Sequence, residues 1–187
     1  NNIFNNIKLI SGPGCPVCVT DEVIIDAAIE IANDENVILV TFGDMLNVKG
    51  SKKSLKDSSM EGKNIKVIQS LLDILKISEE NKDKRVVFLG VGFETTASTI
   101  AMTIHNIEKD KVKNIYFLLS LHLMKPIIHN TLKNRKNKLK GIICPGHVAT
   151  IMGSEYFRFI ADEYNISTVI SGFKPLDIIG GIYRIVD

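Results

Sequence analysis

The alternation of short apolar runs with longer amphipathic stretches most limits what this 187-residue chain can fold into. Seven runs are short and rich in Val and Ile, as strands buried on both faces are. These runs are 7–10, 37–41, 65–68, 85–91, 115–121, 141–144 and 167–171. The stretches between them predict helices over 21–33, 51–61, 69–80, 95–106, 125–133, 154–163 and 175–185. Such alternation predicts the α/β class, with parallel strands and helices on both faces of the sheet.

The charged stretch 78–84 is the best candidate for a boundary between two units of similar size. It predicts a first α/β domain over residues 1–80 and a second over residues 81–187. The chain begins at Asn1 rather than Met, and it ends at Asp187 inside an apolar helical pattern. We therefore expect it to be a fragment of a longer protein.

Composition excludes several functional classes. The net charge is +2 and the basic residues are spread along the chain, which argues against a nucleic-acid surface. No apolar run approaches the roughly 18 residues that a membrane span needs. Two of the three cysteines stand at C-x-x-C spacing, so the cysteines do not form a secreted disulfide framework. They fit a reducing compartment, and we expect a cytoplasmic protein with no nucleic-acid or membrane partner.

The C-x-x-C pair, Cys15 and Cys18, lies in a loop of Gly and Pro. The loop follows the predicted strand 7–10 and precedes the first predicted helix, for which Thr20 is the expected N-cap. Free backbone N–H groups and the dipole at a helix start favour a thiolate. The thiolate is the nucleophilic and metal-binding form of cysteine, so the sequence places chemistry here.

The residues alone leave three interpretations of this pair open: a redox dithiol, half of a metal site, or two packed thiols. A tetrahedral zinc site needs two further ligands, for which Cys144 and His147 are the only candidates. A redox pair after a strand and before a helix matches the spacing and context. Cys144 by itself is typical of a small buried apolar residue.

Four further polar clusters follow predicted strands, where ligands bind in parallel α/β sheets, and they span 41–46, 90–96, 144–150 and 171–177. Asp44 is placed to orient a ligand, accept a proton or cap a turn, and His147 to bind metal or shuttle protons. Glu94, Thr95 and Thr96 follow a Gly-x-Gly sequence that lacks the third glycine of a dinucleotide loop, which argues against nucleotide binding. Capping of the next helix is the structural alternative for the two threonines. If the two halves face each other, these clusters line one shared cleft.

Five motifs, in order, resemble those of the HypD family of hydrogenase maturation proteins. They span nearly the whole chain, which makes a chance match improbable. The motifs are Gly12-Pro13-Gly14-Cys15-Pro16-Val17-Cys18-Val19-Thr20; Phe42-Gly43-Asp44-Met45-Leu46 with Val48, Gly50 and Ser51; Gly92-Phe93-Glu94-Thr95-Thr96-Ala97; Pro145-Gly146-His147-Val148 with Ile151 and Gly153; and Gly172-Phe173 with Pro175-Leu176-Asp177-Ile178.

The resemblance implies a role in assembling the Fe(CN)2CO unit of nickel–iron hydrogenases, together with a HypC-like chaperone and a HypE–HypF cyanide donor complex. It implies two Rossmann-like α/β units, followed by a part that carries a [4Fe–4S] cluster. By position, Cys15 and Cys18 match the redox-active pair of the family. Asp44 and His147 match catalytic residues of its central cleft, and the motif 94–96 matches cofactor-binding residues that line it.

This chain also departs from the family. The upstream Cys-Gly-Gly-His-Thr-His motif, whose Cys holds the iron, is absent, and so are the cysteines that bind the cluster. Asp21 and Ser98 stand where the family usually has proline. We therefore expect the central part of a HypD chain that binds neither iron nor cluster stably by itself and contributes no metal ligand.

The sequence supports one main hypothesis and two alternatives. In the main hypothesis, the chain is part of a maturation scaffold rather than a free-standing enzyme, and its dithiol cycles between thiol and disulfide while Asp44 and His147 supply charge and protons. The first alternative is a free-standing thiol–disulfide oxidoreductase of α/β fold. The second is a small-molecule-binding α/β module in which Cys15 and Cys18 are merely packed.

Overall fold

Two separate parallel sheets organise the computed structural model, which describes residues 7–12, 14–134 and 139–186. The larger sheet has four strands in the order β2-β1-β3-β4. Leu39 pairs with Val87, and Val87 pairs with Tyr116, so the register continues across the three longest strands. The bounds are Val37–Phe42 for β1, Ile65–Ile68 for β2, Arg85–Gly92 for β3 and Ile115–Leu121 for β4. The predicted α/β class with parallel strands is confirmed.

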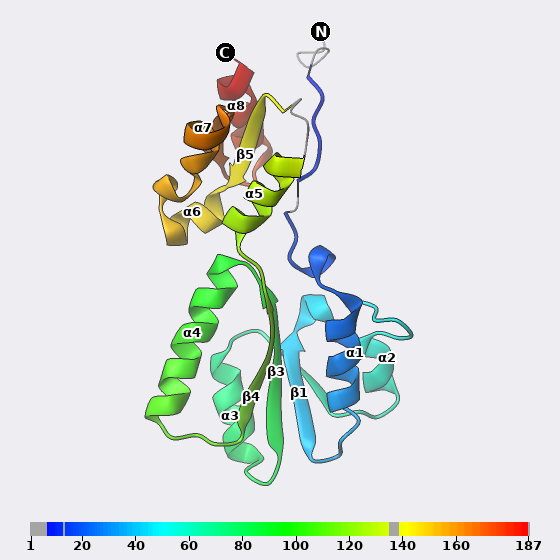
Figure 1. Cartoon of the computed structure of the whole chain (residues 1–187). Helices are drawn as coiled ribbons and strands as arrows, with labels where there is room; N and C mark the ends of the chain where they lie inside the picture. Colours follow the sequence, from blue (N-terminus) through cyan, green and yellow to red (C-terminus); the bar gives the residue numbers. More distant parts are fainter. Residues whose placement is uncertain (1–6, 13, 135–138, 187) are drawn as a thin grey trace.

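Helices cover both faces of this sheet (Figure 1). Leu39 and Leu89 pack with α1 (Glu22–Ile31) and α2 (Leu55–Met60), whereas Val40 and Phe88 pack with α3 (Leu72–Glu80) and α4 (Glu94–Lys109). Neighbouring strand residues point to opposite faces, so a strand covered on both sides must be apolar throughout. This is why the central strands are continuous runs of Val, Ile, Leu and Phe.

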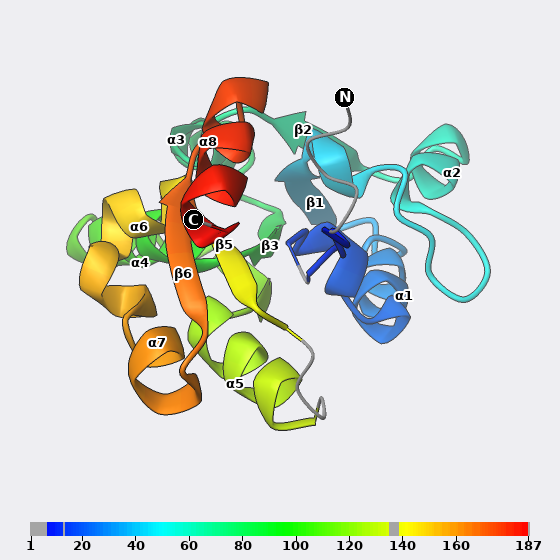
Figure 2. The same ribbon diagram turned by 90° about the horizontal axis from the view of Figure 1, so that it is seen from above.

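The smaller sheet pairs β5 (Gly141–Pro145) with β6 (Ser167–Ser171). Its helices surround it in Figure 2: α5 (Met124–Asn134), α6 (Gly146–Met152), α7 (Phe159–Tyr164) and α8 (Pro175–Val186). We call the larger sheet with α1–α4 the first unit and the smaller sheet with α5–α8 the second unit. The apolar core of the second unit includes Cys144, Val148, Phe157 and Ile160. Phe93, which ends the connection from β3 to α4, belongs to this core and not to the cores of the first unit. None of the helices in the described residues is long and apolar enough to cross a membrane.

The two sheets do not coincide with the predicted units 1–80 and 81–187. β3 and β4 lie after that boundary and pair with β1, and the chain passes to the second sheet only after β4. The charged stretch 78–84 comprises the last residues of α3 and the turn that follows it in the first unit. The side-chain amide of Asn114 donates hydrogen bonds to the carbonyl groups of Ser78, Asn81 and Lys84.

The predicted strand 7–10 is neither strand nor helix in the structure. Leu9 is 62% exposed and Ile10 is 48% exposed, so this apolar run is not buried in either unit. An apolar run becomes a strand only where a neighbouring strand accepts it. Within the described residues, the two sheets are built without this segment.

The first helix begins one residue later than predicted. Asp21, not Thr20, is the N-cap of α1, because the Asp21 carboxylate accepts a hydrogen bond from the backbone N–H of Val23 (3.1 Å). The Thr20 hydroxyl instead donates to the carbonyl of Pro16 at 2.9 Å. Asp21, rather than the predicted Thr20, thus caps the helix.

Candidate functional site

Cys15 and Cys18 lie on a tight turn that precedes α1. The turn contains the 3-10 helix η1 (Val17–Val19), which begins after Pro16, and the Pro16 carbonyl accepts from the Val19 N–H as well as from Thr20. Val17, between the cysteines, packs against the core beneath α1. The turn is therefore fixed by its own hydrogen bonds and by an apolar anchor. The dithiol precedes the helix start by this turn, and none of the described residues before it, 7–12 and 14, is in a strand.

The two sulfur atoms are hydrogen-bonded to each other. The Cys18 thiol donates to Cys15 Sγ at 2.8 Å, and the Cys18 backbone N–H donates to the same sulfur at 3.3 Å. Both cysteines are free thiols in this structure. A disulfide has an S–S distance of about 2.05 Å, so the sulfurs need to approach by only about 0.8 Å to form one.

These hydrogen bonds make the two thiols unequal. The bonds from the Cys18 thiol and N–H lower the pKa of Cys15, because both stabilise a thiolate on that sulfur. The same interaction raises the pKa of Cys18, whose proton is held between the sulfurs. Cys15 is therefore the sulfur on which the thiolate forms first.

Asp44 lies close enough to the dithiol to act on it electrostatically. Its negative charge raises the pKa of Cys15, opposing the stronger effect of Cys18. Asp44 sits in the 3-10 helix η2 (Gly43–Met45), directly after β1, where Met45 is buried and holds the turn. The structure thus brings Asp44 and Cys15, which are 29 residues apart in the sequence, to one place.

A residue that the sequence did not single out holds the segment after Asp44. Asp26, on α1, accepts a hydrogen bond from the Ser51 N–H at 3.0 Å. A side chain at Gly50 would place its Cβ 2.2 Å from the same Asp26 oxygen, so the close approach requires glycine. α1 therefore links the dithiol turn at its start to the segment that follows Asp44.

Thr95 and Thr96 line an open pocket at the carboxyl edge of the larger sheet. Phe42, Leu71 and Thr99 complete its lining. Neither threonine caps α4, because that helix begins at Glu94 after Phe93. The two threonines thus lie at the surface of the first unit.

Glu94 lies apart from that pocket surface, since its side chain is buried and only 3% exposed. Its Oε1 accepts hydrogen bonds from the Met124 N–H and from the Tyr156 hydroxyl, each at 2.6 Å. Tyr156 did not emerge from the sequence, because nothing in its local pattern marks it as the partner of a residue 62 positions away.

His147 and Cys144 flank the end of β5 but face different surroundings. His147 is exposed near the start of α6, and its ring packs against Phe173 with 5.1 Å between centroids. Cys144 is 1% exposed in the core of the second unit, and burial raises its pKa to about 12. The prediction that Cys144 is a small buried residue is confirmed.

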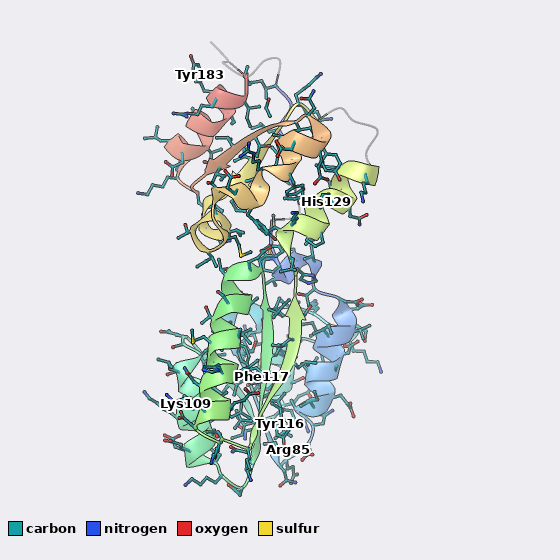
Figure 3. The ribbon with its side chains drawn as sticks, turned by 60° about the vertical axis from the view of Figure 1, so that its left-hand side comes forward. Arg85, Lys109, Tyr116, Phe117, His129 and Tyr183 are labelled. Carbon is teal, nitrogen blue, oxygen red and sulfur yellow. The ribbon has the colours of Figure 1, made fainter. Side chains whose placement is uncertain are left out.

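The turn that carries Cys15 and Cys18, which we call the dithiol turn, lies on the side of the first unit that faces the second unit. The carboxyl ends of the strands of the larger sheet lie on the same side. In Figure 1, β1 and β3 run toward the second unit, β5 runs toward the first, and the turn lies at the carboxyl end of β1. Figure 3 shows Arg85 and Lys109 at the opposite end of the first unit. Because Arg85 begins β3 and Lys109 ends α4, the end of β3 and the start of α4 point toward the second unit.

Comparison with known protein families identifies the family of this chain. The family model for HypD, described as the hydrogenase formation hypA family, matches residues 1–187. The chain belongs to the HypD family. This confirms the family that the five motifs indicated.

The HypD relatives are considerably longer than this chain. It is 37% identical to the hydrogenase maturation factor HypD of Escherichia coli over 181 residues, which cover 97% of this chain and 48% of that protein. A putative hydrogenase expression/formation protein of Methanocaldococcus jannaschii is 38% identical over 180 residues, or 96% of this chain and 50% of that protein. HypD of Rhodobacter capsulatus is 36% identical over 98% of this chain and 48% of its own length. The chain spans about half the length of these curated relatives.

The residues of this chain do not fit the [4Fe–4S] cluster implied by the family resemblance. Such a cluster needs four thiolates, and the sequence has three cysteines. Cys144 is buried in the core of the second unit, away from the surface turn of Cys15 and Cys18. Within the described residues, no three His, Cys, Asp or Glu side chains are grouped as metal ligands.

Proposed function

We propose that this chain is the central α/β part of a maturation factor on which the Fe(CN)2CO unit of nickel–iron hydrogenases is assembled. The match of the HypD family model over the whole chain supports this proposal. The relatives in Escherichia coli and Rhodobacter capsulatus are both described as hydrogenase maturation factors. In this proposal the iron unit is cargo, and its permanent ligands come from parts of the longer protein outside this span.

Cys15 and Cys18 are the redox pair of this scaffold in the proposal. The hydrogen bond between their sulfurs is the observation that carries this role, since it holds the two thiols in position and favours a thiolate on Cys15. Conversion of the two thiols to a disulfide passes two electrons and two protons to the cyanide-bearing group of the donor complex, which is reduced as cyanide is released to the iron. Thiol–disulfide exchange with a second dithiol reduces the pair again.

Asp44 and His147 have supporting roles in the proposal. Asp44 places a negative charge beside Cys15, and His147 offers an exposed imidazole that we assign to proton transfer. The facing sheet ends form the cleft in which the iron unit is held, with Thr95 and Thr96 lining its wall. A HypC-like chaperone and a HypE–HypF cyanide donor complex are the proposed partners, in the cytoplasm.

Single substitutions in the full-length protein test this function. Cys15→Ala or Cys18→Ala is expected to abolish hydrogenase activity in cells that depend on the altered protein. Cys144→Ala is the matched control, because it removes a thiol that is buried away from the proposed chemistry, and it should retain activity. Normal hydrogenase activity in both dithiol variants would refute the redox role.

A second measurement separates this function from that of a free-standing oxidoreductase. The full-length protein is expected to bind iron when a HypC-like chaperone is present and to reduce insulin disulfides poorly. Rapid insulin reduction that requires Cys15 and Cys18, without chaperone-dependent iron binding, would favour the oxidoreductase instead.

A further inference from the structure

The junction between the two units is held by a buried carboxylate. Glu94 belongs to the first helix after β3, whereas both donors to its Oε1, the Met124 N–H and the Tyr156 hydroxyl, belong to the second unit. The other carboxylate oxygen, Oε2, is also buried and has no hydrogen-bond partner among the described residues. The Glu94 side chain therefore accepts two hydrogen bonds that connect the first unit with the second.

Two helix starts explain why an acidic residue is tolerated there. Glu94 is the first residue of α4, which has 16 residues, and Met124 is the first residue of α5, which has 11. Each helix N-terminus carries a partial positive charge, so a carboxylate between them is stabilised from both sides. Without such compensation a buried charge with one unpaired oxygen is costly.

Tyr156 completes the contact from the second unit. Its hydroxyl oxygen also accepts a hydrogen bond from the Lys125 N–H at 3.3 Å, so the phenol joins Glu94 to the first turn of α5. Burial, together with the bond to Glu94, raises the pKa of Tyr156 to about 12, and the phenol keeps the proton that it donates. Next to Glu94, Phe93 packs into the core of the second unit.

We propose that Glu94 and Tyr156 are positioning residues that fix the orientation of the two units relative to each other. The dithiol turn is anchored to the first unit through Val17, and His147 is carried by the second unit at the start of α6. The angle at the junction therefore sets where His147 lies relative to the dithiol. This consequence for maturation rests on the proposed function, whereas the structural role of the junction does not.

Hydrogen exchange in the full-length protein, followed by mass spectrometry of the peptide that spans residues 122–128, tests the junction directly. Glu94→Ala removes both acceptor contacts and is expected to speed exchange there at least about tenfold. Tyr156→Phe should speed it less, about threefold, because Met124 keeps its acceptor. Glu94→Gln retains an acceptor oxygen and should restore most of the protection. This rescue distinguishes the hydrogen bonds from mere loss of volume.

Tyr164→Phe is the matched control. Its hydroxyl is hydrogen-bonded to His129 Nδ1 at 2.8 Å, a contact that lies wholly inside the second unit. We expect no change at the junction peptide for this variant and an unchanged solution-scattering profile, whereas Glu94→Ala should alter the profile. Unchanged exchange and scattering in both Glu94→Ala and Tyr156→Phe would overturn the proposal. Hydrogenase activity in the dithiol variants tests the proposed function separately, so the two failures are distinguishable.

Discussion

Two cysteines of this chain are each followed by proline, yet their environments differ. Cys15 precedes Pro16 on a surface turn of the first unit, and Cys144 precedes Pro145 at the end of β5 in the second. Cys15 Sγ accepts two hydrogen bonds from Cys18, whereas Cys144 lies in an apolar core. The local sequences are similar, but only one site can stabilise a thiolate.

The comparison shows that hydrogen-bond donors and burial, not the neighbouring residues, set the chemistry of a thiol. Donors from Cys18 favour the charged form of Cys15 and lower its pKa. Burial disfavours the charged form of Cys144 and raises its pKa to about 12. The surroundings of Cys15 therefore favour a thiolate, whereas those of Cys144 favour a neutral, packed thiol.

Alkylation of the reduced protein gives the largest expected contrast between these sites. At neutral pH, iodoacetamide should modify Cys15 at least about a hundredfold faster than Cys144, because the thiolate reacts and Cys144 is neutral and buried. Cys18 should fall between them, since its pKa is raised. Fragment-ion mass spectrometry of the peptides resolves the three sites.

The pH dependence of the same reaction provides a stricter criterion. The rate at Cys15 should level off at a lower pH than that of an ordinary cysteine, and the rate at Cys18 at a higher one. Equal rates at Cys15 and Cys144 in the folded protein would break the comparison. Faster reaction at Cys18 than at Cys15 would reverse the assigned asymmetry of the dithiol.

Most of the fold could be predicted because burial requires a periodic pattern of apolar residues in the sequence. The runs 65–68, 115–121 and 167–171 coincide with β2, β4 and β6, since each is short, apolar and flanked by turn residues. The run 7–10 has the same pattern but pairs with no strand among the described residues, so the local pattern is not sufficient there. The predicted boundary at 78–84 does not separate the two sheets, because a charged turn has the same composition within a unit as between units; as a domain boundary it stays a prediction.

The candidate site could be predicted only where one segment carries it. The C-x-x-C spacing already identifies Cys15 and Cys18 as a pair, but their inequality arises from hydrogen-bond directions within the turn. The partners of Glu94 lie 30 and 62 residues away, so its burial depends on how the second unit packs. Its predicted place on a cleft wall stays a prediction.

Alkaline stability offers a second, smaller way to sharpen the comparison. The folded protein holds Cys144 neutral up to about pH 12, whereas in the unfolded chain the thiol ionises near its ordinary pKa of about 9. Stability from this group is therefore present below pH 9 and is lost as the pH rises between these values. At about pH 10 the loss is about 1.4 kcal/mol relative to neutral pH.

Cys144→Ala removes this dependence and is the variant to measure. In urea unfolding, the wild-type protein should lose about 1.4 kcal/mol more than the variant between about pH 7 and about pH 10. If the free energy of unfolding changed with pH in the same way for the wild type and Cys144→Ala, Cys144 would ionise in the folded state as it does in the unfolded chain.

The smallest expected effect concerns Asp44, which acts on the dithiol from across the turn. Its charge raises the pKa of Cys15, so Asp44→Asn should lower that pKa and speed alkylation of Cys15 at neutral pH. The expected increase is about twofold at low salt, and it should fade at high salt, because exposed charges are screened. Asp110→Asn, at the far end of α4, is the matched control and should leave the rate unchanged. If Asp44→Asn slows the reaction instead, Asp44 favours the Cys15 thiolate by accepting its proton. The account in which the charge of Asp44 opposes the thiolate would then be wrong.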